Sequence, residues 1–237
     1  MSRLDYIFTS SEISSKYFIS KFNKFKIDRK TKIINTGYLK LDHIEKKINK
    51  NRDIIKGCIL IAPGYTYAFK KYNMSPYVEK IINLLLTKTN EKIIYRPHPL
   101  DSTKKGDKIF IQKIYSKFKN NPRFSIDLSV SYLNSYKNAK LLITDLSSTA
   151  YTFAFSTLQP VIFFSKNEAL LKKDKLSNSH YFNDRNKIGK IVNHHKNFLK
   201  ELSNTHSKMN RYKNQIKILR KKRIKYFEKA AKVTINE

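Results

Sequence analysis

A turn rich in hydroxyl groups is the first stretch of this sequence that could do chemistry. It spans Asp145–Thr149 and lies between a buried-strand pattern, Leu141–Thr144, and a segment with apolar residues at helical spacing. A helix N-terminus at the carboxyl end of a strand offers unpaired N–H groups and a positive dipole end, which suit a phosphate. The hydroxyls of Ser147, Ser148 and Thr149 would add donors. Helix capping, the other interpretation, accounts for only one or two of these five residues.

The second candidate is the run Arg-Pro-His-Pro at residues 96–99, which ends another strand pattern, Lys92–Arg96. Arg96 could form two hydrogen bonds to a phosphate, and His98 could donate to a phosphate oxygen or exchange a proton near neutral pH. The two prolines stiffen the backbone. A stiff loop with a structural histidine is the alternative, but the adjacent arginine and the position at a strand end favour a functional role.

These candidates depend on strands that alternate with helices along the chain. Strands are predicted near residues 58, 92, 124, 141 and 160. The alternation predicts an α/β domain with a Rossmann-like, doubly wound parallel sheet. Helices are predicted at Pro76–Leu86, Asp107–Lys119, Ser131–Lys140 and Lys187–Leu202, with a long basic helix at His206–Lys232.

Two loops at the ends of these strands carry further candidates. The strand pattern Cys58–Ala62 runs into the aromatic and basic loop Gly64–Tyr72, where Gly64 permits a close backbone approach. The aromatic rings of this loop, among them that of Tyr65, could stack on a base or a sugar, or they could cover the core. Asp127 follows the short strand pattern near residue 124 and is a further candidate.

The N-terminal part of the chain shows a less regular pattern. A strand at Tyr6–Phe8, a helix at Ser11–Phe22 and a strand at Lys32–Thr36 are predicted, and residues 43–56 form a basic helix or linker. We therefore expect three segments: residues 1–56, the Rossmann-like domain at residues 57–205, and the basic C-terminal helix at residues 206–237.

Composition limits the classes of function. The net charge of the 237 residues is +31, and the lysines are spread along the whole chain. This charge fits a compositional bias combined with attraction to an anionic membrane surface. Nucleic acid is an unlikely partner, because no nucleic-acid-binding module is recognisable. No apolar run approaches the ~18 residues of a membrane span, and no signal pattern is present, so we expect a cytoplasmic protein. No metal-ligand pattern is present.

Three stretches together resemble one protein family. The Arg-Pro-His-Pro run, the stretch Leu142–Ser148 and the strand Pro160–Phe164 resemble, in order and spacing, the CDP-glycerol glycerophosphotransferases of teichoic-acid and related surface-polymer synthesis. The start of the chain, from Asp5 to Asp42, looks like the end of that family's N-terminal domain. The resemblance covers most of the chain up to about residue 192.

The resemblance implies the two-domain GT-B fold, of which residues 57–205 would form the C-terminal, donor-binding half. The donor would be CDP-glycerol or a similar CDP-linked alcohol, with no further cofactor. His98 would be the catalytic residue that binds or polarises the donor phosphates. The donor phosphates would contact Arg96, Asp145, Ser147, Ser148 and Thr149, and the loops near the nucleotide or acceptor would contain Gly64, Tyr65 and Asp127.

The resemblance also implies partners and a place in the cell. A hydroxyl of a lipid-linked or polymer acceptor would displace CMP at the β-phosphate, on the inner face of the cell membrane. The family's N-terminal domain carries a catalytic histidine that serves as the base. We expect only the tail of that domain in this sequence. The chain would then be a truncated copy, a donor-binding remnant, or one half of a split enzyme whose partner is a separate N-terminal half-protein.

Two alternatives remain open from the sequence. One is a GT-B glycosyltransferase that uses a sugar nucleotide for capsule or lipopolysaccharide. The other is a non-catalytic module that binds nucleotide or polyanion.

Overall fold

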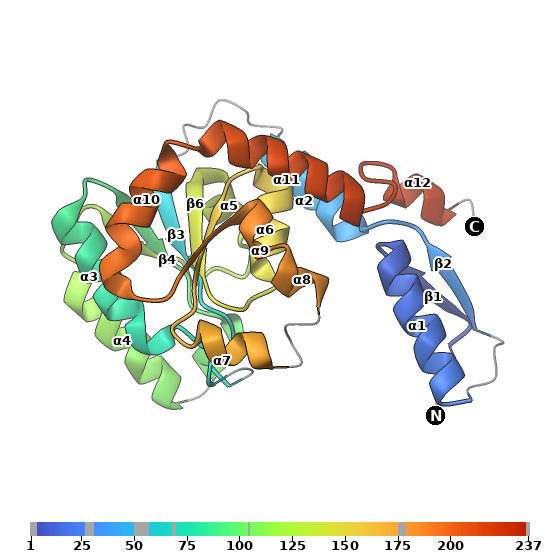
Figure 1. Cartoon of the computed structure of the whole chain (residues 1–237). Coiled ribbons are helices and arrows are strands. Elements are labelled where there is room, and N and C mark those ends of the chain that lie inside the picture. Colours follow the sequence, from blue (N-terminus) through green and yellow to red (C-terminus); the bar gives the residue numbers. More distant parts are fainter. Residues whose placement is uncertain are drawn as a thin grey trace. The chain divides into compact units, whose positions relative to one another are not determined.

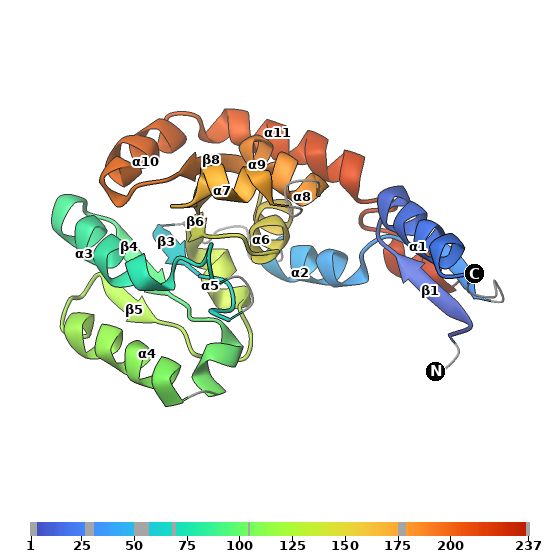
Figure 2. The same ribbon diagram turned by 60° about the horizontal axis from the view of Figure 1, so that its bottom comes forward.

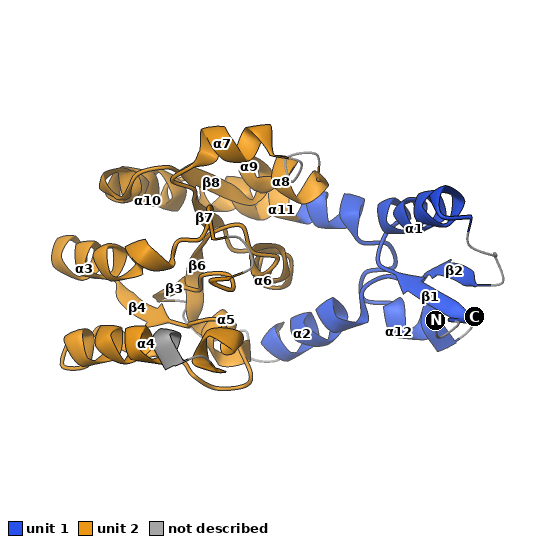
Figure 3. Ribbon diagram, turned by 90° about the horizontal axis from the view of Figure 1, so that it is seen from below, with its two compact units in different colours: residues 1–50, 217–237 blue, residues 51–216 orange. Residues whose placement is uncertain are grey.

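The chain forms two compact units, one made of residues 1–50 and 217–237 and the other of residues 51–216 (Figure 3). The structure, a computed structural model, describes residues 4–26, 31–49, 57–67, 70–103, 105–174 and 179–235. The predicted linker residues 50–56 and two residues of the predicted aromatic loop, 68–69, lie outside the described residues.

A six-stranded parallel sheet forms the centre of the larger unit, with the strand order β5-β4-β3-β6-β7-β8. This arrangement confirms the predicted doubly wound sheet. The strands are β3 (Cys58–Ile61), β4 (Lys92–Tyr95), β5 (Phe124–Ile126), β6 (Ala139–Thr144), β7 (Val161–Phe164) and β8 (Gly189–Val192).

Helices cover both faces of this sheet (Figure 1 and Figure 2). Figure 3 shows α3, α4 and α10 on one side and α5 and α6 on the other. The helices are α3 (Val78–Lys88), α4 (Lys105–Phe118), α5 (Leu133–Asn138), α6 (Thr149–Thr157), α7 (Glu168–Lys173), α8 (His180–Asn183), α9 (Arg185–Ile188), α10 (Phe198–His206) and α11 (Met209–Arg223), the last of which begins in this unit.

The apolar runs of the sequence become strands because both of their faces are buried. Leu141, Leu142 and Ile143 in β6 are fully buried, and Leu60 of β3 pairs with Leu142. Parallel strands with helices on both faces have this continuous apolar pattern. Burial of each such side chain stabilises the fold by about 1.5–3 kcal/mol.

The strand order creates a crevice at the carboxyl edge of the sheet. From β3 the chain crosses to β4 on one side, and the later strand β6 pairs on the other side. This reversal is the position at which open α/β sheets bind ligands. The loops after β3, β4 and β6 meet there, and they contain Gly64, His98 and Ser148.

Strand β8 was not predicted from the sequence, because residues 187–202 were expected to be helical. The strand is short and lies at the edge of the sheet beside β7. A Cβ atom at Gly189 would lie only 1.7 Å from the carbonyl oxygen of Val161, so a residue without a side chain is needed at this close approach.

The smaller unit contains a two-stranded parallel sheet, and the expected N-terminal strands and helix are present in it. The predicted basic C-terminal helix is present as α11 but ends at Arg223 rather than Lys232. A turn held by Asp42 follows, because its carboxylate accepts the N–H groups of Glu228 and Ala230, each at 3.0 Å. The elements of this unit are β1 (Tyr6–Thr9), α1 (Glu12–Lys24), β2 (Lys32–Asn35), α2 (Leu39–Asn49), α12 (Ala230–Ile235) and the end of α11.

The C-terminal residues therefore group differently from our expectation. Residues 217–237 belong to the same compact unit as residues 1–50, whereas residues 206–216 belong with the Rossmann-like unit. The origin of residues 1–56 as the tail of an N-terminal domain stays a prediction. Within the described residues, no helix combines the length and hydropathy needed to cross a membrane.

Candidate active site

A cavity of about 170 Å³ lies at the carboxyl edge of the sheet, and we call it the polar pocket. Six of the residues predicted from the sequence line it. They are Gly64, Tyr65, His98, Asp145, Ser147 and Ser148. Tyr72, Asn73 and Leu146 complete the lining. Tyr72 belongs to the predicted aromatic loop and Leu146 to the predicted turn, whereas Asn73 lies in neither. The structure thus brings together residues from three loops that are far apart in the sequence.

The turn before α6 supplies the features expected of a phosphate site. Ser148 is the N-cap of α6, and its exposed hydroxyl makes no capping hydrogen bond. The hydroxyl of Ser147 accepts the N–H of Thr149 at 3.3 Å. Thr149 begins the helix and does not line the pocket. The positive end of the helix dipole and the Ser148 hydroxyl are therefore available to an anion.

Asp145 connects two segments of the chain at the polar pocket through backbone hydrogen bonds. Its Oδ1 accepts the N–H of Gly64 and its Oδ2 accepts the N–H of Met74, each at 2.9 Å. Asp145 is 4% exposed. A Cβ atom at position 64 would lie 2.8 Å from Oδ1, so glycine is needed for this approach. With both oxygens occupied by backbone donors, Asp145 shapes the pocket rather than contacting a phosphate.

The buried carboxyl of Asp145 makes a pH-dependent contribution to stability. Burial raises its pKa to about 6, although the N–H groups of Met74 and Gly64 act in the opposite direction. In the unfolded chain the pKa of an aspartate is about 3.9. The native protein therefore binds this proton more tightly than the unfolded chain between about pH 4 and about pH 6.

We expect wild-type protein to lose stability relative to Asp145→Asn as the pH rises through that window, and the difference to be constant above it. Denaturant unfolding of both proteins at a series of pH values measures this difference. A wild-type protein that instead gains stability relative to the variant would show that the two N–H donors outweigh burial.

His98 is half-buried in the loop after β4, and its hydrogen bonding fixes which nitrogen faces outward. Its Nδ1 accepts the N–H of Leu100 at 3.2 Å, so the neutral ring carries its proton on Nε2. Burial lowers the pKa of His98, and the Asp101 carboxylate opposes this effect. Because an ordinary histidine pKa is about 6.5, the ring is neutral at pH 7 and offers an Nε2–H donor to the pocket.

Two neighbours position this histidine, and one of them, Asp101, was not predicted from the sequence. The ring of Tyr65 lies 5.4 Å from that of His98, centroid to centroid. Asp101, which is 4% exposed, accepts the N–H and the hydroxyl of Thr66 at 3.2 and 3.0 Å. Asp101 therefore ties the loop after β3 to the short helix that follows His98, Pro99–Thr103. Only its place two residues after the Pro-His-Pro run could have drawn attention to it.

Arg96 and Asp127 pair with each other, and neither lines the polar pocket. The Nη1 atom of Arg96 lies 2.6 Å from Oδ2 of Asp127, and the two side chains are 8% and 15% exposed. A second guanidinium nitrogen donates to the carbonyl of Ser129 at 2.8 Å. The hydroxyl of Ser135 also donates to Asp127. The structure thus uses this pair to hold the loop after β5, whereas the sequence placed the two residues at the ligand.

One family model matches almost the whole chain. Its description is CDP-Glycerol:Poly(glycerophosphate) glycerophosphotransferase, and it matches residues 1–236. No curated protein matches the sequence.

Solved structures of two kinds of protein are similar to this chain. A variant of the wall teichoic acid polymerase TagF soaked with CDPG has a TM-score of 0.60 at 20% identity, covering 98% of this chain and 55% of the TagF chain. TagF itself gives 0.58 at 18% identity, with 98% and 56% covered. The UDP-GlcNAc 2-epimerase of Methanocaldococcus jannaschii, in complex with UDP-GlcNAc and UDP, gives 0.56 at 17% identity, with 91% and 60% covered.

The chain spans just over half the length of these TagF chains. At such identities the likeness shows the fold alone, and it confirms the expected GT-B fold class.

Proposed function

Because the chain belongs to the CDP-glycerol:poly(glycerophosphate) glycerophosphotransferase family, we propose that its polar pocket binds the diphosphate of CDP-glycerol for transfer of glycerol phosphate to a polymer acceptor. The observation that carries this proposal is the meeting of three kinds of phosphate-binding group in one pocket. These are a helix N-terminus, serine hydroxyls and the Nε2–H of His98.

The transfer step has a simple balance. A hydroxyl oxygen of the acceptor forms a bond to the β-phosphorus of CDP-glycerol, and the bond from that phosphorus to the oxygen of CMP breaks. CMP leaves with the bonding electron pair, and the proton of the attacking hydroxyl is lost to solvent. Such a reaction depends mainly on positioning and on stabilisation of the phosphate charge.

His98 fits the charge-stabilising role in this step. Its Nδ1 is occupied by the N–H of Leu100, so the neutral ring is a hydrogen-bond donor at Nε2 and has no free lone pair for a base. A donor aimed at the oxygen that gains charge on the departing CMP would speed the reaction. We assign Ser148 and the N-terminus of α6 to holding the β-phosphate.

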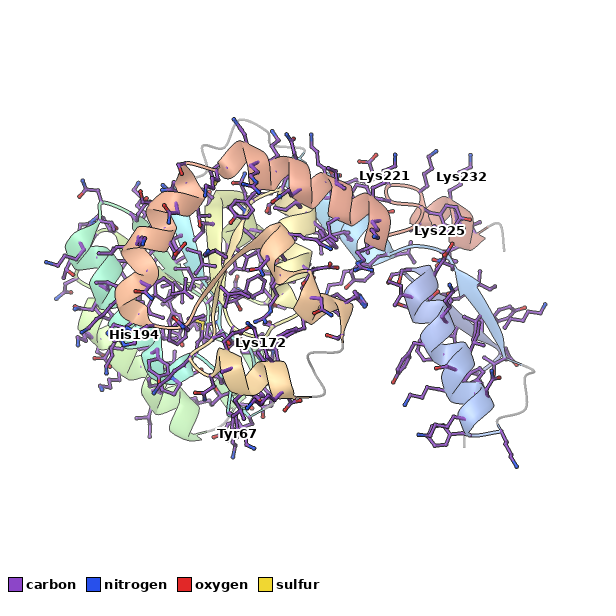
Figure 4. The ribbon with its side chains drawn as sticks, in the orientation of Figure 1. Tyr67, Lys172, His194, Lys221, Lys225 and Lys232 are labelled. Carbon is purple, nitrogen blue, oxygen red and sulfur yellow. The ribbon has the colours of Figure 1, made fainter. Side chains whose placement is uncertain are left out.

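We also propose that the chain meets its acceptor at an anionic membrane surface. The described residues of the smaller unit include sixteen lysines and arginines against five acidic residues. Lys221, Lys225 and Lys232 of its C-terminal segment are labelled in Figure 4. Basic residues near anionic lipid each contribute about 1 kcal/mol. Co-sedimentation with anionic vesicles that disappears at high salt tests this part; equal sedimentation with neutral vesicles contradicts it.

A transfer assay tests the proposed activity. The full chain is incubated with CDP-glycerol and a poly(glycerophosphate) acceptor, and release of CMP and elongation of the acceptor are measured. UDP-linked and CMP-linked sugars serve as donor controls. Elongation with CDP-glycerol supports the proposal, whereas elongation with a sugar nucleotide alone would assign the chain to the glycosyltransferases.

Ser148→Ala is expected to weaken CDP-glycerol binding by about 1.5–3 kcal/mol, the value of a hydrogen bond to a charged group, or roughly 10- to 150-fold. The fold should be unchanged, because this hydroxyl makes no capping bond. Calorimetric titration measures the change. Thr149→Val is the matched control, since Thr149 belongs to the same turn but does not line the pocket. Equal losses in both variants would contradict the assignment.

A further inference from the structure

A cavity of about 280 Å³ lies between the start of β8 and the first half of α11, and we call it the basic pocket (Figure 2). Its polar lining consists of Asn186, Lys190, Lys208, Arg211, Tyr212 and Gln215. Gly189, the first residue of β8, completes the lining. All of these residues belong to the Rossmann-like unit, and the proposed donor site uses none of them.

The basic pocket and the polar pocket lie at opposite edges of the sheet. The polar pocket is built from loops that follow strands, whereas Gly189 begins a strand. Helix α10 returns from the end of β8 to the amino edge, because the Nδ1 atom of its last residue, His206, lies 3.9 Å from Oε1 of Glu91, which directly precedes β4. Sheets of this kind bind their nucleotide at the carboxyl edge, so a ligand of the basic pocket is separate from the donor.

The charge of the basic pocket favours an anion. Among the described residues that line it, three are cations and none is acidic. The Nζ atom of Lys190 lies 3.9 Å from Oε2 of Glu201, which is a long ion pair. Lys208 and Arg211 are exposed, and neither forms an ion pair with a described residue. The pocket therefore has positive charge that its neighbours leave uncompensated.

The other polar side chains add uncharged hydrogen-bonding groups. Within the described part of the chain, the side chains of Asn186, Tyr212 and Gln215 have no hydrogen-bond partner. The two amides can both donate and accept. Burial raises the pKa of the Tyr212 hydroxyl, although the Arg211 guanidinium acts in the opposite direction, so the hydroxyl stays protonated at neutral pH and can donate. A ligand that has phosphate and hydroxyl groups close together would use both kinds of partner.

A glycerol phosphate chain has this combination of groups. Each phosphodiester of such a chain carries a negative charge, and each glycerol is esterified twice and keeps a free hydroxyl. The basic pocket is larger than the polar pocket, which we assign to a diphosphate, so it has room for a phosphate together with its glycerol. A membrane lipid fits less well, because the lining has no exposed apolar side chain that could enter the acyl region.

We propose that the basic pocket binds a phosphodiester and the neighbouring glycerol of the poly(glycerophosphate) acceptor, away from the end that reacts. This inference rests on the proposed function and adds a second contact with the polymer to it. A chain that is held at a second site presents its end to the polar pocket at a higher effective concentration. Only a chain long enough to reach both sites gains from this, so the effect depends on acceptor length.

Removal of two charges from the basic pocket tests the inference. Wild type and Lys208→Gln/Arg211→Gln are titrated calorimetrically with a long poly(glycerophosphate) chain and, separately, with CDP-glycerol. The double variant is expected to bind the polymer at least about tenfold more weakly, the value of one hydrogen bond to a charged group, and CDP-glycerol within about twofold of wild type. Lys213→Gln/Lys217→Gln, at exposed positions of α11 outside the pocket, is the matched control. Tyr212→Phe removes only a hydroxyl and should weaken polymer binding roughly two- to tenfold, which keeps the test decisive if the double variant does not fold.

Acceptor length and lipid binding provide the remaining readouts. In the double variant the KM for long acceptors should rise, whereas the KM for an acceptor of a single glycerol phosphate should not change. Equal losses of polymer binding in the double variant and its control, or no loss in either, would overturn the inference. Weaker binding to phosphatidylglycerol vesicles with unchanged polymer binding would assign the pocket to a lipid headgroup and would overturn it as well. Polymer binding that depends on this pocket in a protein that does not bind CDP-glycerol would refute the proposed donor and leave the inference standing.

Discussion

His98→Ala is expected to lower the rate of glycerol phosphate transfer roughly 100- to 1,000-fold, as removal of one preorganised donor does in other active sites. The ring supplies an Nε2–H to the polar pocket because Nδ1 accepts the N–H of Leu100. The variant should fold normally, since the imidazole is half-buried and Leu100 remains able to bond to water. The rate of CMP release at saturating CDP-glycerol measures the effect.

Two further variants at this position distinguish a donor from a base. The amide nitrogen of a glutamine reaches about the position of Nε2, whereas that of an asparagine corresponds to Nδ1. His98→Gln should therefore retain more activity than His98→Asn, which should resemble His98→Ala. If His98 acted as a base, neither amide could replace it, and equal inactivity of all three variants would contradict the donor role.

Arg96→Ala is expected to lower the free energy of unfolding by about 3–5 kcal/mol, because removal of one member of a buried ion pair leaves the other uncompensated. The side chains of Arg96 and Asp127 are 8% and 15% exposed, and they are joined at 2.6 Å. The guanidinium also holds the carbonyl of Ser129. Denaturant unfolding of the variant and of wild type measures the loss.

Arg96→Lys provides the matched control for this prediction. It keeps the positive charge but cannot reproduce the planar set of hydrogen bonds to Asp127 and Ser129, so its loss of stability should be intermediate. Wild-type stability in Arg96→Ala together with a large loss of CDP-glycerol affinity would restore Arg96 to the donor site, where the sequence placed it.

The sequence was informative about the sheet because burial on both faces leaves a strong local pattern. Runs such as Leu141–Thr144 admit few structures other than an interior parallel strand. Once the strands were identified, topology placed the residues after them at one edge, and His98, Ser147 and Ser148 meet there as predicted. Edge strand β8 carries a weaker pattern and was missed.

Side-chain partners could not be predicted in the same way, because they depend on distances across the fold. The sequence contains no sign that Asp127 would pair with Arg96, 31 residues away, or that Asp101 would hold Thr66, 35 residues away. Both carboxylates hold loops around the pocket in place through hydrogen bonds. The structure is therefore needed to decide which polar residues at strand ends contact a ligand and which support a loop.

The most direct test of the donor site is a calorimetric titration of the full chain with CDP-glycerol at near-physiological salt, with CMP and UDP as controls. The proposed function predicts selective binding of the cytidine ligands, which is weakened in Ser148→Ala and retained in Thr149→Val. No binding of CDP-glycerol would contradict the proposed function. Equal binding of every nucleotide regardless of its base would also contradict it, because non-specific attraction to a chain of net charge +31 would then explain the binding.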